Sequence, residues 1–357
     1  MSTLPKNGCH LYYGEYDEQP NKKLKKLNQP SINYLSITGS HNGLICFADS
    51  NHSLNIHEPI HISNPITREF MNVPRLEVVG ENRIDSMVCG FGYHPSVDKY
   101  KIVKIHYMKN QPLRQVQVYT LGDDSCSGWR GIGQTAYSLR LNNRCSCSGS
   151  RDIGEISLKF ISDGFLCHRC PFGAFANGSL HWLNEEQKIV SFDLSNEMLC
   201  VLPSPPFVRA SSVTDRFQLK VLGGCLCFIH HKPDDELLDI RFLRSKGESN
   251  SHGVNEQEYD LLTWIKEFSF PIEGDTDTEP FAVTKSGEVL LSHKSVICCY
   301  DPKTAAMDRI VDVNFCLAVP HMNTFVSLKA LGEKCRSRKK YVVKFRPRSF
   351  FIKQKKE

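Results

Sequence analysis

The stretch Asn42-Gly-Leu-Ile-Cys-Phe47 joins a small residue to a short apolar strand, and this unit decides the fold because it recurs. Related units are Asn177-Gly-Ser-Leu-His-Trp182, Gly223-Gly-Cys-Leu-Cys-Phe228 and Ser286-Gly-Glu-Val-Leu-Leu291. Short runs of this kind, separated by Gly, Pro, Asn, Asp and Ser, predict antiparallel strands joined by tight turns. Long helical periodicity is scarce.

A turn with its own chemistry follows some of these units. Asn64-Pro65-Ile66-Thr67 and Asp301-Pro302-Lys303-Thr304 both place Asn or Asp before Pro, and Asp193-Leu-Ser-Asn196 is a related turn without Pro. Asn or Asp starts such a turn by bonding to nearby backbone, and Pro presets φ at the second position. The repeating unit is therefore several strands long.

The spacing of the repeat predicts the architecture. Gly178 and Gly224 are 46 residues apart, and about 45 residues with four strands is the size of a propeller blade. We expect an all-β, β-propeller-like domain over residues 34–331, with about six or seven degenerate four-stranded blades; the alternative is a paired β-sandwich. Residues 122–155, 231–258 and 273–279 are expected to be inserted loops, and residues 100–107 a half-exposed strand of alternating polarity.

Composition excludes several classes of protein. The chain has 357 residues, 40% of them hydrophobic, which excludes a disordered protein, a collagen and a disulfide-stapled mini-domain. The 15 cysteines lie mostly in apolar stretches, as reduced buried thiols do. No signal peptide and no apolar run long enough to span a membrane is found. We expect the protein in the cytoplasm, the nucleus or both.

Both ends of the chain differ from the middle. Residues 1–33 are expected to be a lead-in segment and residues 332–357 a basic tail, which holds eleven Lys or Arg and two Glu, so the rest of the chain is mildly acidic. Arg336-Ser-Arg-Lys-Lys340 resembles a nuclear import signal. Neither basic segment interleaves aromatic residues regularly, so the sequence does not favour a nucleic-acid partner.

Four cysteines are candidates for chemistry. Cys145 and Cys147 precede Cys167 and Cys170, and four thiolates can bind zinc tetrahedrally. A zinc-dependent or Cys-based enzyme is therefore one alternative function. The spacing is not a common finger pattern, however, and two pairs of reduced cysteines are the competing interpretation. We predict no catalytic residue, no cofactor and no assigned metal.

Four ordered segments resemble a known family. Gly39-Ser-His-Asn-Gly-Leu-Ile-Cys46 with Ile62-Ser-Asn-Pro-Ile-Thr-Arg-Glu69, Gly90-Phe-Gly-Tyr-His-Pro95 with Asp98-Lys-Tyr-Lys-Ile-Val-Lys-Ile105, Phe175-Ala-Asn-Gly-Ser-Leu-His-Trp182 with Ile189-Val-Ser-Phe-Asp-Leu194, and Phe325-Val-Ser-Leu328 carry the likeness. In this order they resemble the plant F-box-associated, kelch-like domain. The motif positions that we expect to be structural are Gly43, Asn64, Pro65, Thr67, Gly92, Tyr93, Tyr100, Lys101, Asn177, Gly178, His181, Trp182 and Asp193.

The resemblance implies a function. Family members pair an F-box, which docks on the Skp-type adaptor of a Skp–cullin–F-box (SCF) ubiquitin ligase, with a domain that captures the protein to be ubiquitinated. The chain is thus expected to be a non-enzymatic protein-interaction module with an unknown target protein and no membrane partner. No F-box helix follows Leu4-Pro5, so we expect contact with the Skp-type adaptor only where an F-box is supplied. A truncated, non-functional fragment is the remaining alternative.

Overall fold

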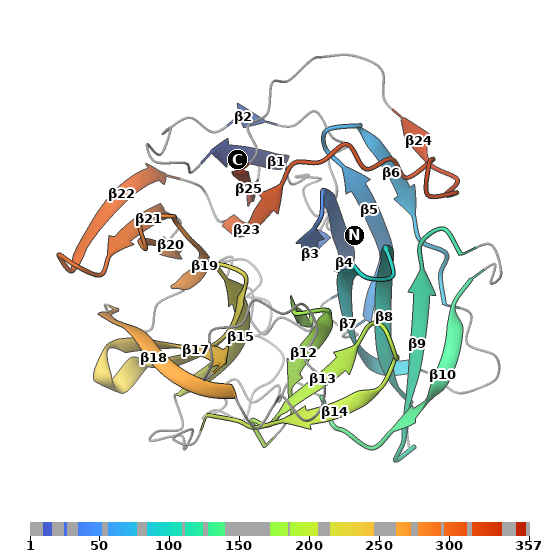
Figure 1. Ribbon diagram of the computed structural model, residues 1–357, viewed down its shortest axis with the longest axis horizontal. Helices are drawn as coiled ribbons and strands as arrows, with labels where there is room; N and C mark the ends of the chain where they lie inside the picture. Colours follow the sequence, from blue (N-terminus) through green and yellow to red (C-terminus); the bar gives the residue numbers. More distant parts are fainter. Residues whose placement is uncertain are drawn as a thin grey trace, which may run out of the picture.

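A computed structural model shows a ring of antiparallel β-sheets around a central axis (Figure 1). The structure describes residues 10–15, 25–26, 35–51, 56–76, 84–108, 111–123, 128–139, 172–184, 186–205, 215–245, 262–272, 278–293, 296–312, 316–337 and 348–354. In that part of the chain, no helix has the length and hydropathy that crossing a bilayer requires.

Five blades follow one another along the chain, each a meander of neighbouring antiparallel strands. Blade 1 contains β3 (Leu35–His41), β4 (Leu44–Asn51), β5 (Ile56–Asn64) and β6 (Glu69–Asn72). Blade 2 contains β7 (Ile84–His94), β8 (Lys99–Met108), β9 (Arg114–Thr120) and β10 (Arg130–Thr135). Blade 3 contains β11 (Ala174–Ala176), β12 (Ser179–Leu183), β13 (Ile189–Asp193) and β14 (Leu199–Leu202).

Blades 4 and 5 lie on the left of the ring in Figure 1. Blade 4 contains β15 (Arg216–Leu222), β16 (Cys225–Lys232), β17 (Leu237–Ser245) and β18 (Leu262–Pro271), with a 3₁₀ turn, η1 (Pro233–Asp235), between β16 and β17. Blade 5 contains β19 (Glu279–Val283), β20 (Val289–His293), β21 (Val296–Asp301) and β22 (Ala306–Asp312).

One further sheet, which we call the closing sheet, joins distant parts of the sequence. Its strands lie in the order β2 (Lys25–Lys26), β1 (His10–Glu15), β25 (Arg348–Gln354) and β23 (Cys316–Met322). It lies between blades 5 and 1, and β23, at one edge of the sheet, contacts both β19 and β3. Segments expected to be a lead-in and a tail thus supply three strands of the ring.

The β-propeller prediction is confirmed, and the paired β-sandwich is excluded by the ring of sheets. The prediction of six or seven blades within residues 34–331 is wrong, because this range holds five complete blades. The physical reason is uneven connections: residues 122–155 and 231–258, which we expected to be loops, contain β10 and the whole of β17. β10 has the sequence RGIGQT, whose glycines and polar residues hide a strand.

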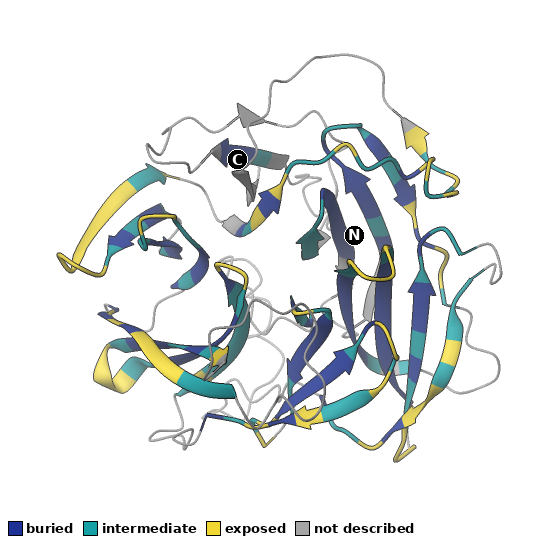
Figure 2. Cartoon of the chain, viewed as in Figure 1, coloured by how far each residue is buried: buried dark blue, intermediate teal, exposed yellow. Residues whose placement is uncertain are grey.

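The core lies between neighbouring blades and along their inner strands (Figure 2). The outer strand β22 is mostly exposed, whereas the residues of β8 from Tyr100 onward are buried. The half-exposed strand expected at residues 100–107 is therefore wrong. Its polar residues have partners inside the protein: Lys101 pairs with Glu197, and Lys104 Nζ lies 4.1 Å from the centroid of the Trp129 ring.

Four hairpin turns place a non-glycine residue in the left-handed region at the fifth position of the turn. These residues are Arg68 (φ 61°), Asp98 (φ 47°), Glu197 (φ 59°) and Ala305 (φ 55°). Left-handed backbone costs an ordinary L-residue about 1–2 kcal/mol, and glycine avoids that cost.

Ala305→Gly is expected to raise the free energy of unfolding by about 0.5–1 kcal/mol, because relief of the left-handed strain exceeds the entropy that glycine adds to the unfolded chain. Urea unfolding monitored by fluorescence measures this change. Lys303→Gly, in the same exposed turn but not in the left-handed region, is the matched control and should not stabilise the protein. Equal effects of the two substitutions would contradict the interpretation.

Candidate partner-binding face

Hairpin turns gather on one side of the ring. Connections in an antiparallel meander alternate between the two ends of its strands, so the turn after the first strand and the turn after the third strand of each blade emerge together. We call this side the turn face. It contains residues 42–43, 65–68, 95–98, 177–178, 194–198, 223–224, 284–288 and 302–305. The long connection from β23 to β25 starts on this side, and its described part, residues 323–337, is called the strap.

Asn64 holds both its own turn and the strap. Its Oδ1 accepts hydrogen bonds from the backbone N–H groups of Ile66 (2.8 Å) and Thr67 (3.4 Å). Its Nδ2 donates to the carbonyl oxygens of Thr324 (3.1 Å) and Val326 (2.7 Å). The side-chain-to-backbone turn bonds are those that the Asn-Pro sequence predicts, with Pro65 at the second position. The bonds to the strap join residues 260 and 262 positions apart and have no local signal.

Gly43 lies directly under the strap. With φ at +87° it adopts backbone that favours glycine, and an added Cβ would lie 1.7 Å from Thr324 Oγ1. The same hydroxyl donates to the Asn42 carbonyl oxygen (3.1 Å), which also accepts from the Tyr100 hydroxyl (2.8 Å). Two predicted motif positions, Gly43 and Tyr100, thus join blade 1 to the strap and to blade 2.

Gly43→Ala is expected to lower the free energy of unfolding by about 2–3 kcal/mol, the sum of left-handed strain and steric displacement of Thr324. Gly224→Ala is a matched control, because Gly224 occupies the same hairpin position (φ +86°) with nothing within 4 Å of the added Cβ. It should lose only about 1–2 kcal/mol of strain. Urea unfolding compares the two variants, and equal losses would show that Thr324 moves aside freely.

Two glutamates fix the rest of the strap. The carboxylate of Glu69 accepts from Ser327 Oγ (3.0 Å) and from the backbone N–H of Leu328 (2.6 Å). That of Glu333 accepts from the Gly122 N–H (3.0 Å) and the Tyr119 hydroxyl (3.2 Å). Leu328 is fully buried in the core formed largely by blades 1 and 2. The sequence assigns no role to Glu69 or Glu333, although Glu69 and Phe325-Val-Ser-Leu328 both lie in segments that carry the family resemblance.

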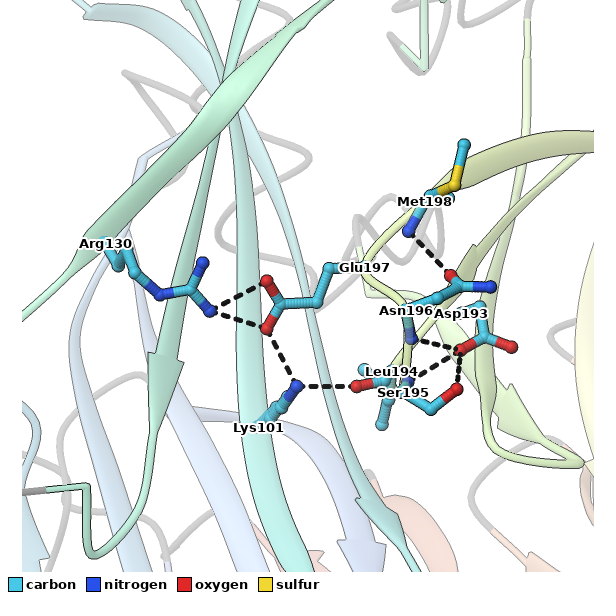
Figure 3. Close-up of polar contacts among 8 residues, drawn as sticks. All are labelled: Lys101, Arg130, Asp193, Leu194, Ser195, Asn196, Glu197 and Met198. Atoms are coloured by element: carbon cyan, nitrogen blue, oxygen red, sulfur yellow. Dashed lines mark hydrogen bonds and ion pairs between the residues drawn. The ribbon is translucent and has the colours of Figure 1, made fainter. Parts of the chain in front are cut away.

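A second polar cluster joins blade 2 to a turn of blade 3 (Figure 3). Glu197 accepts from Lys101 Nζ at 2.8 Å and from Arg130 at 2.7 Å, and Lys101 also donates to the Leu194 carbonyl oxygen at 2.6 Å. Burial alone would raise the pKa of Glu197, but the hydrogen bonds from Arg130 and Lys101 outweigh it and hold the pKa below its usual range. The carboxylate is therefore ionised and acts as an electrostatic tie between two blades.

The turn that carries Glu197 is organised by Asp193. Its Oδ1 accepts from the backbone N–H groups of Ser195 (2.6 Å) and Asn196 (3.0 Å) and from the Ser195 hydroxyl (2.7 Å). Met198 ends the turn with its side chain 63% exposed. Asp193 and Lys101, predicted only as motif positions, thus meet at one inter-blade junction.

The remaining predicted positions support packing. Tyr93 donates to Asp98 Oδ1 (2.9 Å), and Gly92 lies where a Cβ would meet the Phe175 ring at 2.4 Å. Asn177 and Gly178 form the turn between β11 and β12. In β12, His181 Nδ1 lies 3.1 Å from the Ala174 carbonyl oxygen, and Trp182 packs in the core between blades 2 and 3.

The four cysteines proposed as zinc ligands, Cys145, Cys147, Cys167 and Cys170, lie outside the described residues, so the zinc hypothesis stays a prediction. Among the residues that the structure describes, no group of three or more His, Cys, Asp or Glu could hold a metal ion. Burial raises the pKa of the Cys46 and Cys299 thiols to about 12, which keeps both protonated and weakly nucleophilic near neutral pH.

Exposed apolar side chains concentrate on the turn face. Among the residues that the structure describes, five of the eight exposed large hydrophobic ones lie in these turns, beside them or beside or within the strap; they are Val97, Met198, Met307, Met322 and Phe325. Phe325 is 87% exposed and is the most exposed of the eight. Exposed apolar residues gathered on one face are typical of a protein-interaction surface.

Comparisons with known proteins agree with this geometry. The model of the "F-box associated beta propeller domain" family matches residues 9–316. The Arabidopsis thaliana F-box protein At3g07870 is 26% identical over 84% of this chain and 71% of its own length. F-box protein CPR1 is 26% identical over 58% of this chain and 48% of its own length, and F-box/kelch-repeat protein At3g23880 is 22% identical over 75% and 61%; both are from Arabidopsis thaliana.

Similarity to solved structures is weak. The GH93 α-L-arabinofuranosidase of Fusarium graminearum aligns over 97% of this chain and 98% of its own, with 12% identity and a TM-score of 0.38. A similarity of this size carries no functional argument.

Proposed function

Because the chain belongs to the F-box associated β-propeller domain family, we propose that it captures a target protein on its turn face for ubiquitination by an SCF-type ligase. Domains of this family are typical substrate-recognition modules of such ligases. Its curated relatives are F-box proteins. We propose that this chain acts as they do through binding, without an enzymatic step of its own, in the cytoplasm or the nucleus.

One observation carries the proposal. The turn face displays exposed apolar side chains on turns whose backbone is fixed by internal hydrogen bonds: the Met198 carbonyl oxygen accepts from the Asp193 N–H (3.0 Å), and Phe325 precedes Val326, whose carbonyl oxygen accepts from the buried Asn64. Side chains presented by a rigid scaffold lose little conformational entropy when a partner binds. The polar residues beneath them, Asn64, Lys101 and Glu197, are already engaged within the protein and serve to position this surface.

Contact with the ligase is a separate part of the proposal. The chain spans 71%, 48% and 61% of the lengths of the three relatives above, so the activities of those whole proteins are not transferred to it directly. We propose that the Skp-type adaptor is reached through an F-box, and that the propeller contributes target capture alone.

The test uses the full chain expressed in plant cells with a proximity-labelling tag. A target is expected to be labelled by the wild-type chain and by Leu113→Asp, which changes an exposed residue on the opposite side of the ring. Met198→Asp should lose that labelling, because it places a charge within the turn face. The proposal fails if no labelled protein depends on turn-face residues, or if the purified chain turns over a small-molecule substrate.

A further inference from the structure

Phe325 is presented by a rigid segment. Its ring is 87% exposed, yet the carbonyl oxygens of both neighbours, Thr324 and Val326, accept hydrogen bonds from Asn64 Nδ2. Three residues further along, Leu328 is fully buried. Aromatic residues are enriched at protein interfaces, and a fixed backbone favours binding because little ordering is needed. Met322, the last residue of β23, is 55% exposed and adds an apolar side chain immediately before the strap.

The charge that the strap shows to solvent is positive. Its exposed charged residues are Lys329, Lys334 and Arg336. The nearby acidic groups, Glu69 and Glu333, are engaged by groups of the protein: Glu69 by Ser327 and Leu328, and Glu333 by Tyr119 and Gly122. The cations therefore lack an exposed acidic neighbour on the strap, in contrast to the mildly acidic remainder of the chain.

The strap keeps these features together. Near its start it is bonded to Asn64, and at its end β24 (Arg336–Ser337) pairs with β6 through Phe70 and Glu69. Both ends of the strap thus contact one hairpin of blade 1, where Figure 1 shows it crossing the blade. The aromatic ring and the three cations are thus exposed side chains of one segment, residues 325–336.

We propose that the strap selects an acidic polypeptide segment of the target protein, with one large apolar side chain that packs on Phe325 and Met322 and carboxylates that pair with Lys329, Lys334 and Arg336. This inference rests on the proposed function and names the chemistry of its target. A polypeptide fits better than a nucleic acid, because binding of single strands uses several aromatic platforms in a basic groove. The strap has one exposed ring on an otherwise mildly acidic chain.

The test measures fluorescence anisotropy of labelled twelve-residue peptide pools with the full chain. The first pool has one Leu, Phe or Trp flanked by Asp and Glu; the second replaces the acids with Asn and Gln; the third replaces the apolar residue with Ala. The first pool is expected to bind saturably, and each of the others about tenfold more weakly. Binding of the first pool should weaken as salt is raised, because exposed charge pairs are screened.

Variants locate the site. Phe325→Ala and the double variant Lys329→Glu/Lys334→Glu should each weaken binding of the first pool about tenfold or more. The matched control is Lys285→Glu/Lys303→Glu, which reverses two exposed charges in turns of blade 5 and should bind as the wild type does. All these side chains are exposed, so thermal unfolding should be nearly unchanged, which shows that any loss of binding is local.

Three results would overturn the proposal: binding unaffected by Phe325→Ala, no binding of the first pool, or equal competition by a single-stranded oligonucleotide of matched charge. Its failure can be separated from failure of the proposed function. If the target labelled in cells is lost with Met198→Asp but kept with Phe325→Ala, the strap proposal is wrong and turn-face capture stands. If no target depends on the turn face, both are wrong.

Discussion

Replacing Glu197 with alanine is expected to lower the free energy of unfolding by about 3–4 kcal/mol, because it leaves a buried ammonium group without its counter-charge. The side chain of Lys101 is 10% exposed and that of Glu197 is 15% exposed, so water cannot fully replace the lost carboxylate. The Leu194 carbonyl oxygen would remain as a neutral partner of Lys101. Urea unfolding of purified variants measures the effect.

Arg130→Ala provides the control within the same cluster. Its side chain is 41% exposed, so removing it deletes a screened contact to the same carboxylate and should cost less than about 1 kcal/mol. Lys101→Met should recover much of the loss in the Glu197→Ala background, because it removes the unpaired charge itself. If Glu197→Ala and Arg130→Ala destabilise equally, the cluster is a surface contact and not a tie between blades.

Acid is expected to destabilise the propeller strongly between pH 6.5 and about pH 4. Burial lowers the pKa of His181 and of His231 from 6.5 to about 4, and that of His321 to about 3. Unfolding returns each ring to its ordinary pKa, so below pH 6.5 the unfolded state binds more protons and stability falls as the pH drops. The pKa shifts of His181 and His231 correspond to about 3 kcal/mol each, and the larger shift of His321 corresponds to about 5 kcal/mol.

Urea unfolding between pH 8 and pH 4.5 tests this expectation, with His321→Gln predicted to show a shallower pH dependence than the wild type. Ser40→Ala is the control: Ser40 Oγ lies 2.7 Å from His321 Nδ1, so this change removes a hydrogen bond but keeps the titrating ring. It should lower stability at every pH and keep the slope. Identical slopes for the wild type and His321→Gln would contradict the assignment.

The urea experiment stops at pH 4.5 so that the effect of the histidines is measured before the buried carboxylate of Asp239 contributes. Burial alone would raise the pKa of Asp239, but hydrogen bonds from Lys266, Ser269 and Lys232 outweigh it and lower the pKa to about 2. A group with a depressed pKa loses its contribution as pH falls from its ordinary value, 3.8, toward the folded value. Asp239 therefore adds to acid unfolding mainly below pH 4.5, the lower limit of the urea experiment.

Local chemistry was readable from the sequence. The Asn-Gly and Gly-Gly pairs at 42–43, 177–178 and 223–224 stand between first and second strands, where their positive φ values fit two-residue hairpins. Asn64, Asp193 and Asp301 each accept backbone hydrogen bonds in the turn that they begin. These hydrogen bonds join residues two or three positions apart, so sequence neighbours specify them.

Contacts between segments far apart in the chain could not be predicted from the sequence. The strap is held by Asn64, Glu69 and Gly122, which lie more than 200 residues before it, and no pattern within the strap indicates these partners. The polar residues of β8 alternate as an exposed strand would, yet they are buried because Glu197, in a turn of blade 3, and Trp129, just before β10, contact them. The blade count was wrong for the related reason that unequal connections obscure the period.

The closing sheet has a consequence for synthesis on the ribosome. β1 emerges early, but in the finished sheet it lies between β2 and β25, and β25 comes more than 330 residues later. At about 5–20 residues per second, this strand waits tens of seconds with one unpaired edge. During that time the five blades form an open arc whose two rims are exposed. The nascent chain should therefore depend on chaperones until residues 348–354 have left the exit tunnel and β25 has paired with β1 and β23.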